Sequence, residues 1–310
     1  MERAARLIAA LMFSALSAVP GFAQENAQGR PDGLFPWQMD LQAPATRVAE
    51  HISWFSWYTV IIMAAIVLFV VGLLAWVIFK YNERANPTPS RVTHNTTVEV
   101  LWTILPVLIL VAIAVPSFRL LYAQYNPSII YEDFDPETTP FLTLKVTGYQ
   151  WYWGVEYGAD EDGTGLGIAD PVVYDITMIQ DADVDAGKGQ LRNLSVDNPI
   201  VVPVNTFVRV QVTAADVLHS FAIPAFGIKT DAVPGRLNET YFKAEREGIF
   251  YGQCSERCGQ DHAYMPAAVQ VVSADAFRAW AASAGTDLPA AYERLAEIRE
   301  AETNTKLAVR

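Results

Sequence analysis

Residues 57–79 read WYTVIIMAAIVLFVVGLLAWVIF, and no side chain in this stretch is charged. A helix needs about 20 residues of this kind to cross the hydrocarbon core of a bilayer, so the stretch is long enough to span one. Tryptophan and tyrosine gather near both ends, as in the aromatic belts of membrane interfaces: Trp54, Trp57, Tyr58, Trp76 and Tyr81. The sequence therefore predicts a transmembrane helix here.

A second apolar stretch, VLWTILPVLILVAIAVPSF, occupies residues 100–118. Pro106 and Pro116 are compatible with a membrane helix, because neighbouring groups can satisfy the carbonyls that proline leaves free. A helical hairpin buried inside a soluble protein is the alternative. We favour two membrane spans, and we predict a transmembrane helical hairpin over residues 53–122.

The loop between the two spans carries Lys80, Arg84 and Arg91 against a single acid, Glu83. Positively charged loops stay in the cytoplasm, so this loop is predicted to be cytoplasmic. Both ends of the chain, and everything after the second span, then lie on the other side. We expect a protein of the cell inner membrane that crosses it twice, with both termini periplasmic.

The first 23 residues are typical of a signal peptide. Arg3 and Arg6 give a positive start, residues 7–19 are apolar, and residues 21–23 end in small side chains. A third membrane helix is the alternative, but the apolar run is shorter than the roughly 20 residues that a span needs. Residues 24–52 would then be an exported N-terminal segment.

After residue 123 the hydrophobic pattern alternates with a period of two, as in half-buried strands. Six stretches show it, separated by Gly, Pro, Asp and Asn: residues 141–147, 172–177, 207–213, 239–244, 248–253 and 267–272. Many short strands without intervening helices predict an all-β sandwich or barrel, here over residues 123–280. Within it, residues 158–199 form an acidic insertion rich in Gly and Asp. Residues 281–310 are expected to be a helical tail.

The charge is uneven along the chain, which has a net charge of −12. Residues 123–310 hold 14 basic and 27 acidic side chains, whereas residues 1–122 are nearly neutral. Nucleic acid is excluded as a partner because its phosphates would be repelled, and a basic protein is favoured instead. With only two cysteines, a disulfide scaffold is also excluded.

Those two cysteines lie in the segment CSERCGQDHAYM, residues 254–265. Cys254, Cys258, His262 and Met265 place two thiols, an imidazole and a thioether within it, and His219 is a second imidazole further upstream. Soft sulfur ligands together with imidazoles favour copper, and a mononuclear blue-copper site needs only one cysteine. Two thiolates can bridge two copper ions, with one histidine on each, Met265 capping one ion and a backbone carbonyl the other.

Other interpretations of this segment exist. Cys254 and Cys258 could form a disulfide in an oxidising compartment. Structural zinc would accept two cysteines and two histidines, although it would leave Met265 unused. A membrane-anchored structural or assembly protein with such a disulfide or zinc is therefore one alternative function.

Four further motifs complete a resemblance that covers roughly residues 45–280. They are VEVLWTILP (98–106), VTGYQWYWGVEY (146–157), ADVLHSFAIPAFGIKTDAVPGRLNET (215–240) and YGQCSERCGQDHAYMP (251–266). The chain resembles subunit II of the haem-copper cytochrome c oxidases, of the bacterial and mitochondrial type. The resemblance implies a membrane-anchored fold in which the hairpin precedes a periplasmic, cupredoxin-like Greek-key β domain. Arg257 departs from the apolar residue expected there, while the ligand positions are intact.

The resemblance also implies the metal ligands. Cys254 and Cys258 would bridge the two ions of a dinuclear copper centre, called CuA. His219 and Met265 would complete one ion, and His262 with the Glu256 carbonyl the other. The Glu256 carboxylate resembles a ligand of a magnesium ion shared with subunit I.

Four more residues match positions with a role in the family. Trp151 resembles the surface tryptophan through which cytochrome c delivers electrons, although by strand spacing alone it would be a core aromatic. Glu99, which by position alone would be an interfacial side chain, matches the mouth of a proton channel called K. Glu156 and Asp216 match the docking patch for cytochrome c. The implied partners are cytochrome c, oxidase subunits I and III, and the lipid bilayer.

Two related classes of protein are less favoured. Subunit II of a quinol oxidase has the same architecture but lacks the copper ligands. A nitrous oxide reductase has the copper motif but should carry a large propeller domain and no membrane hairpin. The expected function is therefore electron transfer from cytochrome c to the haem and copper centres of subunit I. That transfer would support oxygen reduction and proton pumping, with the oxygen-reducing site in another chain.

Overall fold

The computed structural model describes residues 34, 38–88, 90–132, 134–135, 137–158, 168 and 171–308. The predicted signal peptide lies outside the described residues, as do residues 24–33 and 35–37 of the expected exported segment and part of the acidic insertion. The chain divides into two compact units. One is helical, Glu50–Ala123, and the other contains the residues before and after it.

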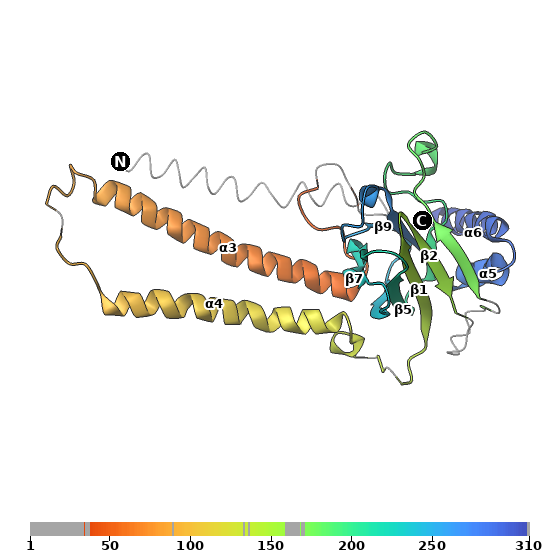
Figure 1. Ribbon diagram of the computed structural model, residues 1–310, viewed down its shortest axis with the longest axis horizontal. Coiled ribbons are helices and arrows are strands. Elements are labelled where there is room, and N and C mark those ends of the chain that lie inside the picture. The colour runs from red at the N-terminus through yellow and green to blue at the C-terminus, as the bar shows by residue number, and fades with distance from the viewer. Residues whose placement is uncertain are drawn as a thin grey trace. The chain divides into compact units, whose positions relative to one another are not determined.

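The helical unit consists of the two long apolar helices, α3 (Arg47–Lys80) and α4 (Thr96–Ala123), shown in Figure 1. Both are long and apolar enough to cross a membrane, as the sequence predicts. Their large side chains are exposed, for example Phe69 and Leu110, which suits a surface that faces lipid. A hydrogen bond from the Tyr58 hydroxyl to the Ala112 carbonyl, 3.2 Å long, joins the two helices.

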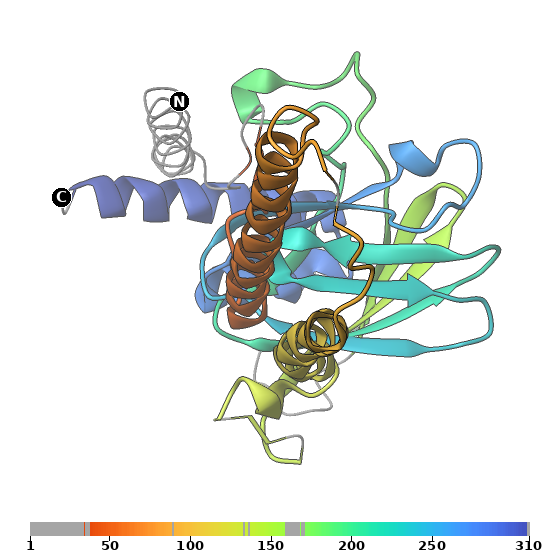
Figure 2. The same ribbon diagram turned by 90° about the vertical axis from the view of Figure 1, so that its left-hand side faces the viewer.

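The second unit is built on three β-sheets (Figures 1 and 2). The five-stranded sheet has the order β3-β2-β1-β5-β8, the three-stranded sheet β4-β10-β9, and the last pairs β6 with β7. The strands are β1 (Phe141–Tyr149), β2 (Tyr152–Tyr157), β3 (Val172–Ile176), β4 (Ile200–Pro203), β5 (Phe207–Ala214), β6 (His219–Ile223), β7 (Ile228–Ala232), β8 (Asn238–Lys243), β9 (Gly248–Gln253) and β10 (Pro266–Val272). All six strands predicted from the alternating pattern are confirmed.

Pairing within the sheets is mostly antiparallel, with parallel ladders between β1 and β5 and between β4 and β10. Alternation directs one face of the outer strands inward: on β3, Val172, Tyr174 and Ile176 are buried and the residues between them are exposed. Strands β4, β6 and β10 are buried along their whole length. The sheets therefore enclose one continuous apolar core.

The C-terminal helices complete that core. In α5 (Ala274–Ala284), Phe277 and Trp280 are fully buried, and the Trp280 ring centroid lies 5.2 Å from that of Tyr157. In α6 (Leu288–Ala308), the Tyr292 hydroxyl donates a 2.6 Å hydrogen bond to the Pro199 carbonyl. The domain boundary expected at residue 280 thus falls inside α5. Figure 2 shows the far end of α6 extending beyond the sheets.

Candidate metal centre

The sulfur ligands lie on a loop whose two ends are fixed by one β ladder. Cys254 directly follows β9 and Met265 directly precedes β10, and these strands pair antiparallel with Gln253 opposite Pro266. Between them, His262 begins the 3-10 turn η4 (His262–Tyr264). His219 reaches the loop from β6, which packs against β9. The loop and His219 thereby bring their donor atoms close together.

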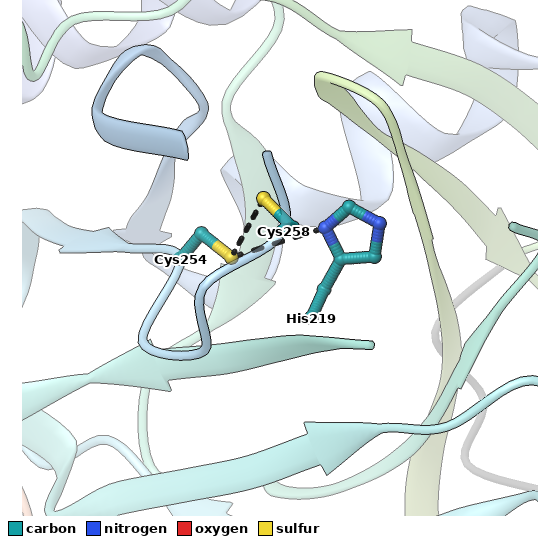
Figure 3. A group of neighbouring side chains, drawn as sticks. All are labelled: His219, Cys254 and Cys258. Carbon is teal, nitrogen blue, oxygen red and sulfur yellow. Dashed lines mark hydrogen bonds between the residues drawn. The ribbon is translucent and has the colours of Figure 1, made fainter. Parts of the chain in front are cut away.

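The two cysteines and His219 lie at the centre of this group of donor atoms (Figure 3). Cys254 and Cys258 are free thiols whose sulfurs lie 3.8 Å apart, so the disulfide alternative is wrong for this structure. The His219 Nδ1 atom lies 3.9 Å from the Cys254 sulfur. All three residues are buried, with exposed fractions of 0%, 6% and 3% for His219, Cys254 and Cys258.

The remaining donors expected from the sequence lie against the same two sulfurs. The Cys258 sulfur is 3.6 Å from His262 Nδ1 and 3.5 Å from the Met265 sulfur. The Cys254 sulfur is 3.3 Å from the Glu256 carbonyl oxygen. The structure therefore brings together every donor group that the sequence assigns to the metal centre.

The two thiols differ in acidity although they are neighbours. Burial disfavours ionisation of Cys254, but hydrogen bonds with His219 and with the backbone of Ser220 and Glu256 lower its pKa to about 6. Burial and the adjacent charge of Cys254 raise the pKa of Cys258 to about 12. A cation that binds both sulfurs takes them as thiolates, so its binding releases protons.

Asp216 holds the other ring nitrogen of His219. Its Oδ1 atom lies 2.9 Å from His219 Nε2, and its Oδ2 atom accepts a 2.7 Å hydrogen bond from the Gln150 backbone N–H. A carboxylate at one nitrogen of a histidine leaves the other free to bind metal and fixes the orientation of the ring. The Trp153 ring, edge-on to His219 with centroids 5.9 Å apart, confines it further. Asp216, expected at a docking patch, thus also supports a residue that is expected to bind metal.

Trp151 and Gln150 lie at the tip of the hairpin between β1 and β2. Both contact the loop of residues 254–265, which we call the metal loop. The Gln150 side-chain amide donates a 2.8 Å hydrogen bond to the Cys258 carbonyl. A Cβ atom added to Gly259 would lie only 3.0 Å from the Trp151 ring, so the indole rests against that residue. No motif in the sequence points to a role for Gln150. Its partner lies 108 residues further along the chain, and no spacing pattern reveals such a contact.

The other expected site residues lie elsewhere. Glu156 on β2 stands opposite Lys145 on β1 and forms a 2.8 Å ion pair with it. Glu99 lies in the first turn of α4, where its carboxylate accepts a 3.2 Å hydrogen bond from the Asn95 backbone N–H. That contact closes the start of the helix, as in a capping box. The structure therefore gives each of these two acids a local partner.

Both the helical part and the β domain of the chain are similar to known proteins. Residues 35–120 match the family model of the cytochrome c oxidase subunit II transmembrane domain, and residues 142–272 match that of its periplasmic domain. A probable cytochrome c oxidase subunit 2 from Rickettsia bellii is 46% identical over 248 residues, which cover 80% of this chain and 84% of the relative. The chain belongs to the cytochrome c oxidase subunit II family.

A second curated relative and a solved structure are also similar to this chain. Cytochrome c oxidase subunit 2 of Cereibacter sphaeroides is 43% identical over 274 residues, 86% of each chain. The crystal structure of the periplasmic domain of cytochrome oxidase subunit II from Bradyrhizobium japonicum is 52% identical and covers 46% of this chain and 92% of that one, with a TM-score of 0.39. Because both subunit II family models match, this chain is a membrane-anchored subunit of the oxidase with a periplasmic domain, and the predicted membrane hairpin and cupredoxin-like β fold are confirmed.

The donor set fits the copper that the subunit II family implies. Two thiols, a thioether and two imidazoles are soft or borderline ligands, which favour copper over the hard cations that prefer oxygen. Zinc would not use the thioether of Met265, which is buried and 3.5 Å from the Cys258 sulfur. A quinol oxidase subunit, which lacks these ligands, is excluded by the assembled donors.

Proposed function

We propose that this chain receives electrons from cytochrome c at a dinuclear copper centre and passes them to the oxygen-reducing subunit. Cys254 and Cys258 would bridge both ions, as their facing sulfurs allow. His219 and Met265 would complete one ion, and His262 with the Glu256 carbonyl the other. The observation that carries this proposal is the pair of free, buried thiols 3.8 Å apart, with one imidazole beside each sulfur.

When bound, the two copper ions supply a one-electron redox couple shared across the bridging sulfurs. The chain's own contacts hold the donors in place: Asp216 orients His219, and the ladder between β9 and β10 closes the loop. Burial of the sulfurs excludes water and keeps their surroundings apolar, which influences a redox potential. Rigid ligands suit electron transfer because little rearrangement need accompany a change of charge.

Trp151 would be the point of electron entry, since its ring rests on the loop that carries the ligands. The acidic surface around it would attract a basic cytochrome c and accelerate the encounter. Glu156 and Asp216 are the proposed docking acids. Asp175 is a further acid near this hairpin tip, and the sequence did not point to it. Burial is the main reason that the pKa of Tyr152 is raised, and the negative charges of Asp175 and Asp216 raise it further, so both carboxylates lie nearby.

Three further assignments rest on the family alone. The Glu256 carboxylate would bind magnesium together with subunit I, and Glu99 would stand at the mouth of the proton channel K. Subunit III would be a further partner in the inner membrane. The termini would face the periplasm after removal of a signal peptide, with the basic loop of Lys80, Arg84 and Arg91 in the cytoplasm.

Metal analysis of the purified oxidase tests the copper proposal. We expect two copper ions in this subunit and a near-infrared absorption band, both lost in Cys254→Ser because a hydroxyl cannot bridge as a thiolate does. Ser255→Ala is the matched control, since Ser255 is exposed on the same loop and its hydroxyl donates a hydrogen bond to the Gln253 carbonyl. Zinc in place of copper, or a band that survives Cys254→Ser, would refute the assignment.

A further inference from the structure

Two consecutive residues of the β1–β2 hairpin contact two consecutive residues of the metal loop. Gln150 donates its side-chain amide to the Cys258 carbonyl at 2.8 Å, and the Trp151 ring packs on Gly259. Gly259 has φ of +130°, a conformation that side chains other than glycine rarely adopt. An added Cβ would also lie 3.0 Å from the Gln150 amide nitrogen. The hairpin tip is therefore fitted closely to the residues that follow the bridging sulfur.

The Trp151 side chain has no polar anchor of its own among the described residues. Its indole N–H is buried and has no hydrogen-bond partner there. The polar contacts of this hairpin tip come from Gln150, whose side chain binds Cys258 and whose backbone N–H binds Asp216. Asp216 in turn holds His219. Gln150 thus connects the segment that carries Trp151 to both sides of the metal centre.

We propose that Gln150 is a positioning residue for electron entry, which holds the Trp151 indole against the metal loop through its hydrogen bond to the Cys258 carbonyl. This inference rests on the proposed function. In the step concerned, reduced cytochrome c gives up one electron and the metal centre gains it, with no bond or proton exchanged. Gln150 acts on this step through Trp151 and does not itself need to touch cytochrome c.

Gln150→Met tests the proposal because it keeps the length of the side chain and removes the amide donor. A neutral hydrogen bond of this kind shifts a local equilibrium by about fivefold. We expect electron entry from bound cytochrome c, measured by rapid mixing at saturating cytochrome c, to slow by about fivefold. The Michaelis constant and its salt dependence should match those of the parent, and the near-infrared band should persist. Gln180→Met is the control, since it makes the same change on an exposed loop, where the amide donates a 3.4 Å hydrogen bond to the Met178 carbonyl.

Two more measurements separate positioning from other roles. Hydrogen–deuterium exchange of the peptide covering residues 254–262 should accelerate in Gln150→Met, because the loop loses a contact. In a Trp151→Phe background, Gln150→Met should have little further effect on the rate, as expected for residues that act through one another.

Several results would overturn the proposal. An unchanged rate would show that the hydrogen bond does not matter for entry. A change confined to the Michaelis constant would make Gln150 a docking contact, and loss of the near-infrared band would make it a support of metal binding. If Gln150→Met slowed electron entry equally in the parent and in the Trp151→Phe background, Gln150 would not act through the Trp151 ring. Failure of the proposed function is distinct, because the parent oxidase itself would then lack copper or not oxidise cytochrome c.

Discussion

The ion pair between Lys145 and Glu156 allows a test in which two charge removals should act in opposite directions. Lys145 Nζ and the Glu156 carboxylate are 2.8 Å apart on neighbouring strands, so at a distance they act as a neutral pair. Lys145→Gln would leave an unpaired carboxylate beside the proposed docking surface, whereas Glu156→Gln would leave an unpaired ammonium. The first should favour the encounter with a basic cytochrome c, and the second should oppose it.

The size of the effect follows from Coulomb's law. Two opposite unit charges about 10 Å apart in water attract by about 0.4 kcal/mol, which is about a twofold change in affinity. At 0.1 M salt the Debye length is about 10 Å, so the effect shrinks to about 1.3-fold. The two side chains are 39% and 43% exposed, and a pair of this kind contributes less than about 1 kcal/mol to stability. Neither substitution should therefore disturb folding or assembly.

The assay is steady-state oxidation of cytochrome c at two ionic strengths. At low salt the Michaelis constant should fall about twofold in Lys145→Gln and rise about twofold in Glu156→Gln, with the double variant near the parent and the turnover number constant. Arg278→Gln, which leaves Asp275 unpaired on α5, controls for net charge alone. If both single variants shift the Michaelis constant in the same direction, or if Arg278→Gln reproduces Lys145→Gln, the docking surface does not include this pair.

Three further outcomes are expected. Met265→Leu should retain copper but shift the redox potential of the centre, because an axial thioether tunes a site more than it holds the metal; a redox titration equal to that of the parent would exclude Met265 as a ligand. Trp151→Phe should slow electron entry from bound cytochrome c with nearly unchanged binding, and equal rapid-mixing rates would reduce Trp151 to a packing residue. Trp280→Ala should lower the free energy of unfolding by about 3–5 kcal/mol, since it empties a fully buried site in the core. Denaturant unfolding checks this, and a loss below about 1 kcal/mol would show that α5 is peripheral.

The alternating strands were predictable because one of their faces is buried and the other is not. Strand β3 shows this well, with Val173 exposed between buried Val172 and Tyr174. Strands β4 and β6 escaped the same criterion, because the structure covers both of their faces and every residue in them is buried. A short, wholly apolar run does not distinguish a buried strand from other buried segments. Alternation alone does not decide the outcome: β10 is buried throughout yet was predicted, whereas β2 and β7 alternate in burial and were not predicted.

Some residues of the metal site could likewise be predicted from the sequence and others could not. One short loop holds Cys254, Cys258, His262 and Met265, so the sequence alone predicted that they bind a metal together. The role of Gln150 was not predictable, because its side-chain hydrogen bond joins residues 108 positions apart. Asp216 lies only three residues before His219, but that spacing does not show that its carboxylate contacts the imidazole. Asp216 was expected only at a docking surface, and its contact with His219 shows that removing its charge would also disturb a ligand. Effects of Asp216 substitutions on cytochrome c kinetics therefore need metal content measured beside them.

The position of His219 relative to the cysteines depends on one close approach between strands. At Gly252 on β9, an added Cβ would lie 1.8 Å from the Ala222 carbonyl oxygen of β6, so no other residue permits this packing. Immediately beyond it, the Ser255 N–H donates a 3.0 Å hydrogen bond to the Ser220 carbonyl. The start of β6 is thereby held against the end of β9, which places His219 beside Cys254, and Asp216 fixes the orientation of its ring. These contacts between strands fix the backbone that carries His219 and Cys254, and a rigid scaffold of this kind suits a centre that changes charge with little change of shape.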